Sequence, residues 1–216
     1  MKHQKGLSLI ELMIAILISS LLMLGVLQLF SNTSASDRTS SAVARVQESG
    51  RIALEIIGAD ARRAGYQGCS SSANTTTVGS LTFPAAGVAA ANKSVTFRYA
   101  TTADTGTRFG TNLTCADDPV YLQTVTYSRC PSNGLERICR SVNGGNADPI
   151  LDNANITAIT FGYLGGGNLL WKESASVSTS DLEAAHAVRI TLSITDQRNE
   201  ITNEFTGTYE LRNRLE

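Results

Sequence analysis

The sequence predicts an α+β fold, in which a long N-terminal α-helix packs on an antiparallel β-sheet head. Three observations predict it. An apolar run occupies residues 7–30, a helical pattern of apolar residues continues to about Arg63, and short segments of strand character fill the chain after Cys69. We expect the first half of the helix to span a membrane and the second half to be amphipathic.

The apolar run is long enough to cross a bilayer. As a helix, its roughly 24 residues would extend about 36 Å, against a hydrocarbon core of about 30 Å. Lys2 and Lys5 precede the run, and basic residues at a membrane segment favour the cytoplasmic side. The rest of the chain is therefore expected on the opposite side of the membrane.

The helical pattern continues beyond the apolar run, over residues 31–64. Apolar side chains recur there mostly at spacings of three and four, at Val43, Val46, Ala53, Leu54, Ile57 and Ala61. The first proline of the chain is Pro84, so an uninterrupted helix to about Arg63 is permitted. Gly65 stands where a helix-ending glycine is expected.

The chain beyond the helix has the pattern of half-buried strands. The clearest alternation is Val188, Ile190, Leu192 and Ile194, with polar residues between them. Comparable segments are expected at residues 94–99, 120–127, 135–142, 155–163, 187–195 and 201–213. The last two are separated by DQRN, a hairpin-like turn. We expect these strands to form an antiparallel sheet packed on the helix.

The four cysteines all follow the apolar run. An even number of cysteines in an exported region favours disulfides over free thiols. The segment CPSNGLERIC places a turn signal between two strands, so its hairpin would bring Cys130 and Cys139 together. Cys69 would then pair with Cys115. Four cysteines allow three connectivities, of which this is the one we expect.

The charge pattern argues against a nucleic-acid partner. The net charge is −1 and the sequence pI is about 6.1. Lys and Arg are scattered along the chain, whereas nucleic-acid binding requires a clustered basic excess.

Catalytic and metal-binding patterns are weak. His186 is the one histidine beyond the first three residues, and no GxSxG motif accompanies it, so we expect neither an enzyme nor a cofactor. The cysteines lack the CxxC spacing of a zinc site. Asp117, Asp118 and Asp152 are weak calcium candidates without EF-hand spacing, and a role in turns is favoured for them.

One charge interrupts the apolar run, at Glu11. A carboxylate at the centre of a bilayer helix costs on the order of 2.5–3.5 kcal/mol or more. A cleaved secretory signal would need a small-residue site after the run, and SNTSAS at 31–36 matches one poorly. A plain membrane anchor leaves the cost unexplained. Cleavage between Gly6 and Leu7, with the helix retained, accounts for it.

Cleavage after Gly6 would create a new amine on Leu7, four residues before Glu11 and on the same helix face. The helix macrodipole favours a carboxylate near that end. Glu11 could then pair with this amine or with that of a neighbouring subunit, and a charge pair in an apolar bundle costs less than either charge alone.

The segment KGLSLIELMIA at 5–15 resembles the signature of type IV prepilins: a basic residue, Gly, an apolar first mature residue, and Glu as the fifth mature residue. The resemblance implies cleavage between Gly6 and Leu7 by a prepilin peptidase and N-methylation of Leu7. Leu7 stands where most family members have Phe. The fold expected from the resemblance is pilin-like.

The head is similar to PilW-type minor pilins in RIALEIIGADARRAGYQGC at 51–69, LERICR and AVRITLSI. The resemblance implies a subunit that primes a type IV pilus, is incorporated at its tip, and supports pilus biogenesis, twitching motility or adhesion. Implied partners are other minor pilins, the major pilin, prepilin peptidase, the inner-membrane assembly platform and a tip adhesin. Implied locations are the inner membrane of a Gram-negative bacterium, with the head in the periplasm, and later the surface pilus.

The expected organisation is therefore a leader at 1–6, a membrane and assembly helix at 7–30, its amphipathic continuation at 31–64, and a disulfide-bonded head at 65–216. Two alternatives stay open. A minor pseudopilin of type II secretion shares the same helix-and-sheet plan, and a membrane-anchored periplasmic enzyme is the more distant possibility.

Overall fold

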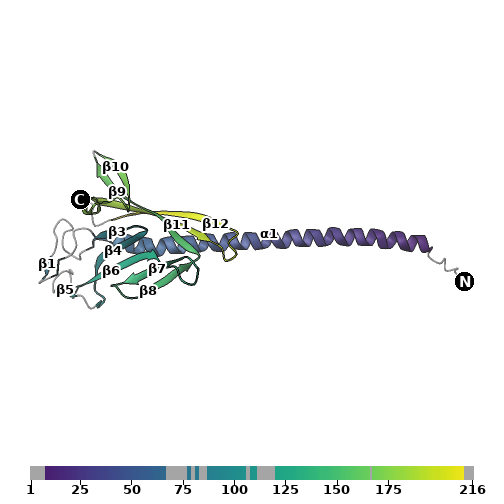
Figure 1. Cartoon of the computed structure of the whole chain (residues 1–216), viewed down its shortest axis with the longest axis horizontal. Coiled ribbons are helices and arrows are strands. Elements are labelled where there is room, and N and C mark those ends of the chain that lie inside the picture. The colour runs from purple at the N-terminus through teal and green to yellow at the C-terminus, as the bar shows by residue number, and fades with distance from the viewer. Residues whose placement is uncertain are drawn as a thin grey trace. The chain divides into compact units, whose positions relative to one another are not determined.

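In the computed structural model, the described residues are 8–66, 77–78, 81–82, 87–105, 108–110, 120–165 and 167–211. The chain divides into two compact units, Met1–Ala44 and Arg45–Glu216. The first unit contains the N-terminal part of helix α1. The second contains the rest of α1 and all the strands, and we call it the head (Figure 1).

Helix α1 (Leu9–Arg63) ends where the sequence predicts. Gly65 follows it with a φ of 81°, a left-handed conformation that glycine adopts without steric cost. Within the head, α1 has one buried face, formed by Val46, Ala53, Ile57 and Ala61. The expected amphipathic pattern is thus confirmed for this part of the helix.

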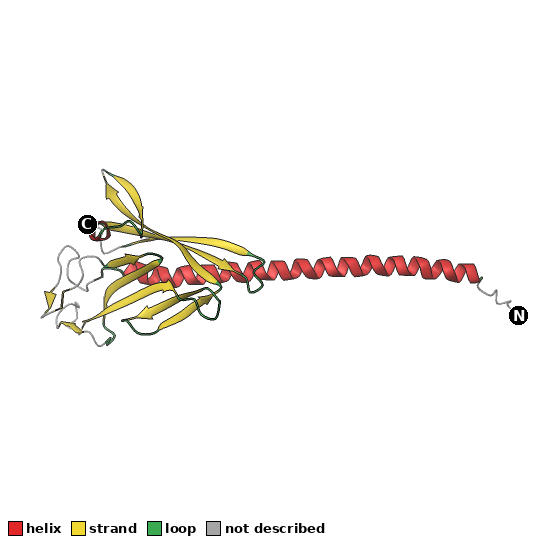
Figure 2. Ribbon diagram, in the orientation of Figure 1, coloured by secondary structure: helices red, strands yellow, loops and turns green. Residues whose placement is uncertain are grey.

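The head contains two antiparallel sheets of four or more strands (Figure 2). The first sheet has the order β3 (Val88–Ala91), β4 (Ser94–Thr101), β6 (Val120–Arg129), β7 (Arg137–Val142) and β8 (Ala147–Asp152), with β5 (Arg108–Gly110) paired to β6. The second has the order β10 (Asn168–Glu173), β9 (Ala154–Gly165), β11 (Ala185–Thr195) and β12 (Thr202–Glu210). A further small sheet pairs β1 (Thr77–Val78) with β2 (Leu81–Thr82), and the short helix α2 (Thr179–Glu183) links β10 to β11.

The α+β class is confirmed, and the sheets are more numerous than the single sheet expected. The sequence pattern did not predict β1, β2, β3, β5, β8, β10 or α2. β3 is a short run ending in three alanines, and β8 contains Pro149, which is compatible with the edge position that β8 occupies.

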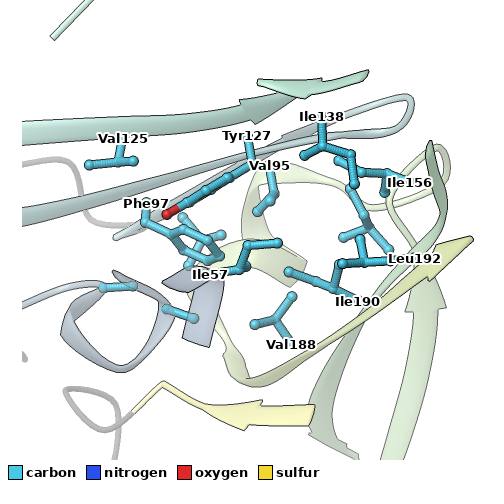
Figure 3. Close-up of a cluster of buried hydrophobic side chains, with 14 of the residues drawn as sticks. Ile57, Val95, Phe97, Val125, Tyr127, Ile138, Ile156, Val188, Ile190 and Leu192 are labelled. Atoms are coloured by element: carbon cyan, nitrogen blue, oxygen red, sulfur yellow. The ribbon is translucent and has the colours of Figure 1, made fainter. Parts of the chain in front are cut away.

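One hydrophobic core joins α1 to both sheets (Figure 3). The largest side chains in it are fully buried, and they come from α1, β4, β6, β7, β9 and β11: Ile57, Val95, Phe97, Tyr127, Ile138, Ile156, Phe161, Ile190 and Leu192. Helix α1 therefore packs against both sheets through one apolar face.

Two glycines of α1 allow the aromatic side chains of β12 to lie against the helix. A Cβ atom at Gly50 would lie 2.6 Å from the Phe205 ring, and one at Gly58 would overlap the Tyr209 ring. The Tyr209 hydroxyl donates a hydrogen bond to the Leu54 carbonyl oxygen at 2.5 Å. Glycine weakens a helix interior by about 1 kcal/mol relative to alanine. At Gly50 and Gly58 this loss of helix propensity is offset by close packing of the helix against β12.

A buried carboxylate ties α1 to the first sheet. Asp60 is 4 % exposed, and its carboxylate accepts hydrogen bonds from the Tyr99 hydroxyl at 2.8 Å and the Tyr127 hydroxyl at 2.6 Å. Arg140 donates to the same carboxylate from Nε at 3.2 Å and Nη2 at 3.1 Å. The charge is thus paired and hydrogen-bonded, as a buried charge must be.

The two phenols of this cluster remain neutral donors over a wide pH range. Burial, followed by the neighbouring Asp60 carboxylate, raises the pKa of Tyr99 to about 12. The same causes, in the same order, raise the pKa of Tyr127 above its usual value. Their hydroxyl hydrogens therefore stay available to Asp60.

We predict that Gly58→Ala destabilises the head by about 2 kcal/mol, because the added methyl group would displace the Tyr209 ring. Gly25→Ala is the matched control on the same helix, since a Cβ there meets nothing within 4 Å. Chemical unfolding of the full chain in detergent, followed by the fluorescence of the single tryptophan, Trp171, measures both. An equal cost of Gly58→Ala in a Tyr209→Ala background would contradict the explanation.

We predict that Asp60→Asn lowers the free energy of unfolding by about 3 kcal/mol, because it leaves the Arg140 charge without its partner. Glu55→Gln, at an exposed position of the same helix, should change it by less than about 0.5 kcal/mol. Similar midpoints for the two variants in urea would show that the Asp60 cluster contributes little.

Candidate functional site

The candidate site is the N-terminal part of α1, where large apolar side chains are exposed along the helix. Between Leu9 and Phe30, the exposed fractions of these side chains range from 51 % to 77 %. By length and composition, α1 contains one stretch that can cross a membrane. Glu11 is the one ionisable residue between Leu9 and Phe30.

Glu11 lies in the first turn of α1. Its amide donates to the Ser8 carbonyl at 3.0 Å, and the Leu12 amide donates to the same oxygen at 3.1 Å. The carboxylate therefore lies at the positive end of the helix macrodipole. It forms no ion pair with any other residue that the structure describes.

Other polar side chains of this segment find partners within the helix. The Ser20 hydroxyl donates to the Leu17 carbonyl at 2.8 Å, and the Thr33 hydroxyl donates to the Leu29 carbonyl at 2.9 Å. Such bonds to a preceding turn satisfy a hydroxyl without a second chain. A carboxylate has no proton to donate to a carbonyl, so Glu11 cannot be satisfied in this way.

The predicted cleavage and methylation positions, Gly6 and Leu7, lie outside the described residues. Only the sequence spacing relates them to Glu11. Leu7 and Glu11 are four residues apart, a spacing that places two residues on the same face of a helix.

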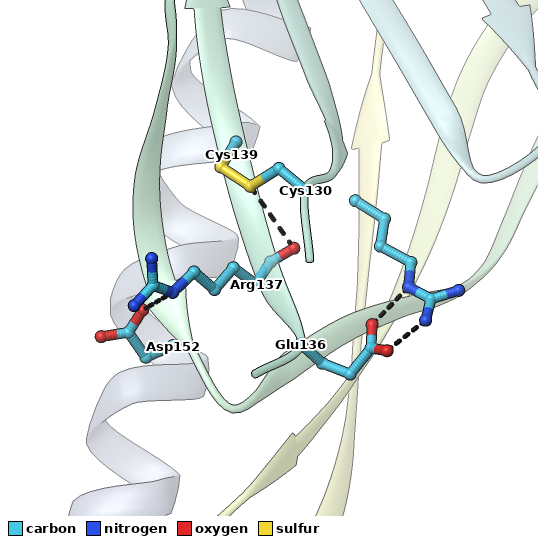
Figure 4. The surroundings of a disulfide bond; sticks show 6 residues. Cys130, Glu136, Arg137, Cys139 and Asp152 are labelled. Carbon is cyan, nitrogen blue, oxygen red and sulfur yellow. Dashed lines mark hydrogen bonds and ion pairs between the residues drawn. A yellow bond between two sulfur atoms is a disulfide. The ribbon is translucent and has the colours of Figure 1, made fainter. Parts of the chain in front are cut away.

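The expected Cys130–Cys139 disulfide is present, with the two Cα atoms 5.8 Å apart (Figure 4). It closes the β6–β7 hairpin, whose turn residues Asn133 and Gly134 have φ values of 52° and 77°. Two positive φ values in a two-residue loop match the right-handed twist of the paired strands. Cys69 and Cys115 lie outside the described residues.

The β6–β7 hairpin also carries ion pairs that engage its charged residues. Arg129 pairs with Glu136 through two hydrogen bonds. Arg137 Nε lies 2.8 Å from an Asp152 carboxylate oxygen. The carboxylate of Asp152 therefore forms an ion pair with Arg137.

The described residues contain no group of three or more His, Cys, Asp or Glu side chains that could hold a metal ion. The calcium candidates Asp117 and Asp118 lie outside them. His186 Nδ1 lies 2.8 Å from the Ala184 carbonyl oxygen, a contact that orients the ring locally.

The structure adds an exposed apolar site that sequence reasoning did not single out. Leu164, Leu169 and Leu170, on the β9–β10 hairpin, are 59 %, 46 % and 44 % exposed. The sequence signal was the run Leu169-Leu170-Trp171 beside a glycine-rich turn. Three consecutive apolar residues do not show the alternation that marks a half-buried strand.

Comparison with known proteins places the chain among prepilin-like proteins. A family model described as a prokaryotic N-terminal methylation motif matches residues 1–27. A second model, described as prepilin peptidase-dependent protein B, matches residues 39–211. A search of curated protein sequences found no significant match.

Among solved structures, the chain is similar to a type IV-like pilin from Thermus thermophilus. The two share 12 % sequence identity and a TM-score of 0.44, over 80 % of this chain and 98 % of the other. The prepilin peptidase-dependent protein B model covers most of the chain, and the methylation motif covers the apolar start of α1. The chain therefore belongs to the prepilin peptidase-dependent protein B family.

Proposed function

We propose that the chain is a minor pilin, a structural subunit that primes assembly of a type IV pilus and is incorporated at its tip. The observation that carries the proposal is Glu11, a lone carboxylate in a helix segment that exposes apolar side chains. Such a segment needs other apolar helices or lipid around it, and its carboxylate needs a positive partner.

Processing would supply that partner. Prepilin peptidase removes residues 1–6 by cutting between Gly6 and Leu7, and the new N-terminus at Leu7 is methylated. A methylated amine remains basic and carries its charge at neutral pH. Glu11 then neutralises this amine or that of the adjacent subunit.

The charge pair would also set the stagger between subunits. Apolar helix faces pack with little preference for one axial position, because dispersion contacts are non-directional. Where the amine and the carboxylate belong to different subunits, they meet only in the correct register, and every other register leaves two unpaired charges. Assembly is therefore specific without catalysis.

The proposed division of the chain follows from this mechanism. Residues 7–30 hold the subunit in the inner membrane and later form the fibre bundle, residues 31–64 continue the helix, and residues 65–216 form the periplasmic and later surface-exposed head. Proposed partners are other minor pilins, the major pilin, the assembly platform and a tip adhesin. Such a subunit would support twitching motility or adhesion in a Gram-negative bacterium.

A minor pseudopilin of type II secretion is the second candidate, since it would use the same leader, helix and charge pair. The PilW-like segments at 51–69 and in β7 and β11 favour the pilus. Co-purification from membranes separates the two, because each machine has its own assembly platform.

Mass spectrometry of the mature protein tests the processing. We expect the chain to begin at Leu7 and to carry one methyl group on its amine. Protein that still begins at Met1, or that begins after Phe30, would remove the amine from the reach of Glu11 and overturn the proposal.

We predict that Glu11→Ala lowers recovery of the subunit in sheared fibres by about tenfold or more, since each 1.4 kcal/mol lost is a factor of ten. Gln28→Ala is the matched control, a polar residue of the same helix segment without charge. Both variants should keep the Cys130–Cys139 disulfide. Normal incorporation of Glu11→Ala would show that the carboxylate has no role in assembly.

A further inference from the structure

The β9–β10 hairpin presents an open strand edge with apolar side chains on both faces. It projects from the rest of its sheet (Figure 2). β10 is the terminal strand of the order β10-β9-β11-β12, and no described strand lies along its outer edge. Leu169 and Leu170 point to opposite faces, because successive strand residues alternate, and both are exposed.

The hydrogen-bond pattern identifies which main-chain groups of β10 are free to pair. The register places Glu173 opposite Thr160, and the next pair is joined by a hydrogen bond from the Ser174 amide to the Ile159 carbonyl at 2.8 Å. In an antiparallel pair, every second residue bonds to the partner strand. The N–H and C=O groups of Leu169 and Trp171 therefore point away from β9.

The other edges of the two larger sheets carry features that discourage strand addition. β3 has four residues, and β8 contains Pro149 beside a register shift. β12 exposes Glu204 and Glu210. Short strands, prolines, irregular pairing and charges are the usual means of blocking an edge. From Leu169 to Trp171, β10 has none of them.

We propose that β10 pairs with β10 of a second copy of this chain, antiparallel and about a two-fold axis through Leu170. Leu169 then lies opposite the partner's Trp171, and each copy's Leu170 lies opposite the partner's Leu170. The two Leu169–Trp171 pairs exchange four main-chain hydrogen bonds, which use all the free groups of these residues. Lys172 faces the partner's Asn168, so no like charges meet.

Neighbouring registers fit less well. A shift of two residues in one direction pairs Leu169 with the partner's Glu173, whose equivalent carbonyl in this chain already accepts a bond from the Ser176 amide at 2.9 Å. A shift in the other direction brings in Gly167, a turn residue with a φ of 83°. The register centred on Leu170 avoids both.

Sheet twist determines how the Arg45–Arg63 helix segments of the two heads are oriented in this pairing. β12 runs in the same direction as α1, because Phe205 lies at Gly50 and Tyr209 lies at Gly58. Three strand steps of about 20–25° turn β10 by about 60–75° from the axis of β12. A two-fold axis normal to the sheet at β10 then leaves the two Arg45–Arg63 helix segments about 30–60° apart, so both extend to the same side.

The interface is small, and a dimer of this kind depends on confinement in the membrane, which raises the local concentration. The role of the dimer rests on the proposed function. A two-fold pair differs from the parallel helix bundle of a fibre, so the dimer would be a resting form of the subunit before assembly. In this form, the second copy would cover the apolar edge of β10.

Cysteine cross-linking of the full chain in membranes tests the pairing. Residues directly opposite in a non-hydrogen-bonded antiparallel pair have Cα atoms about 4.5 Å apart, within the range of a disulfide. We expect Leu170→Cys to give a covalent dimer on mild oxidation, at least tenfold above Leu164→Cys. Leu164 is the matched control, since it is exposed on the same hairpin but lies away from the axis. The chain without either substitution is the control for any covalent dimer formed by the native cysteines.

Leu169→Pro in the Leu170→Cys background tests whether the cross-link forms through strand pairing or through random collision of two copies. The Leu169 N–H points away from β9, so proline there removes a donor for the second copy and leaves the β9–β10 bonds in place. We expect the cross-link to fall at least fivefold while Trp171 fluorescence and the Cys130–Cys139 disulfide are retained. Equal cross-linking of Leu170→Cys and Leu164→Cys, or a cross-link unaffected by Leu169→Pro, would overturn the proposal. Neither result depends on processing at Gly6 or on Glu11, so failure here is distinct from failure of the pilin assignment.

Discussion

The head depends on one contact, the packing of the Arg45–Arg63 segment of α1 against both sheets. The apolar face of this segment supplies Ile57 and its neighbours to the core, and Gly50 and Gly58 let the aromatic rings of β12 approach the helix closely. Asp60 fixes the rotation of the helix, since its carboxylate meets donors from β4, β6 and β7 at once. Most stability of a helix in a protein comes from such packing rather than from propensity.

The elements with strong periodicity could be predicted from the sequence. α1 ends at Arg63, as the spacing of its apolar residues and the position of Gly65 indicate. The long strands β9 and β11 follow from their alternation, and the Cys130–Cys139 bridge follows from the turn between its cysteines. In each case a local pattern and the tertiary fold agree.

The remaining features depend on contacts between distant parts of the chain. Gly50 and Gly58 weaken the helix locally, and only the rings of Phe205 and Tyr209 explain them. In the sequence, Asp60 looks like one of the polar residues of an amphipathic helix. Only the fold shows that Tyr99, Tyr127 and Arg140 donate hydrogen bonds to it. The glycines and the carboxylate thus look unfavourable in sequence, and each becomes favourable through a partner that is more than 35 residues away.

The same reasoning, applied to the other end of α1, supports an external partner for Glu11. Asp60 and Glu11 are carboxylates in apolar parts of one helix, and the fold supplies Asp60 with three donor side chains. The fold supplies Glu11 with no ion-pair partner among the described residues, while the hydroxyl of Ser20 nearby is satisfied by its own helix. A carboxylate in such surroundings is stable only with a positive charge beside it. The proposed cleavage after Gly6 would supply that charge at the chain's own N-terminus, and the proposed assembly would supply it from another subunit.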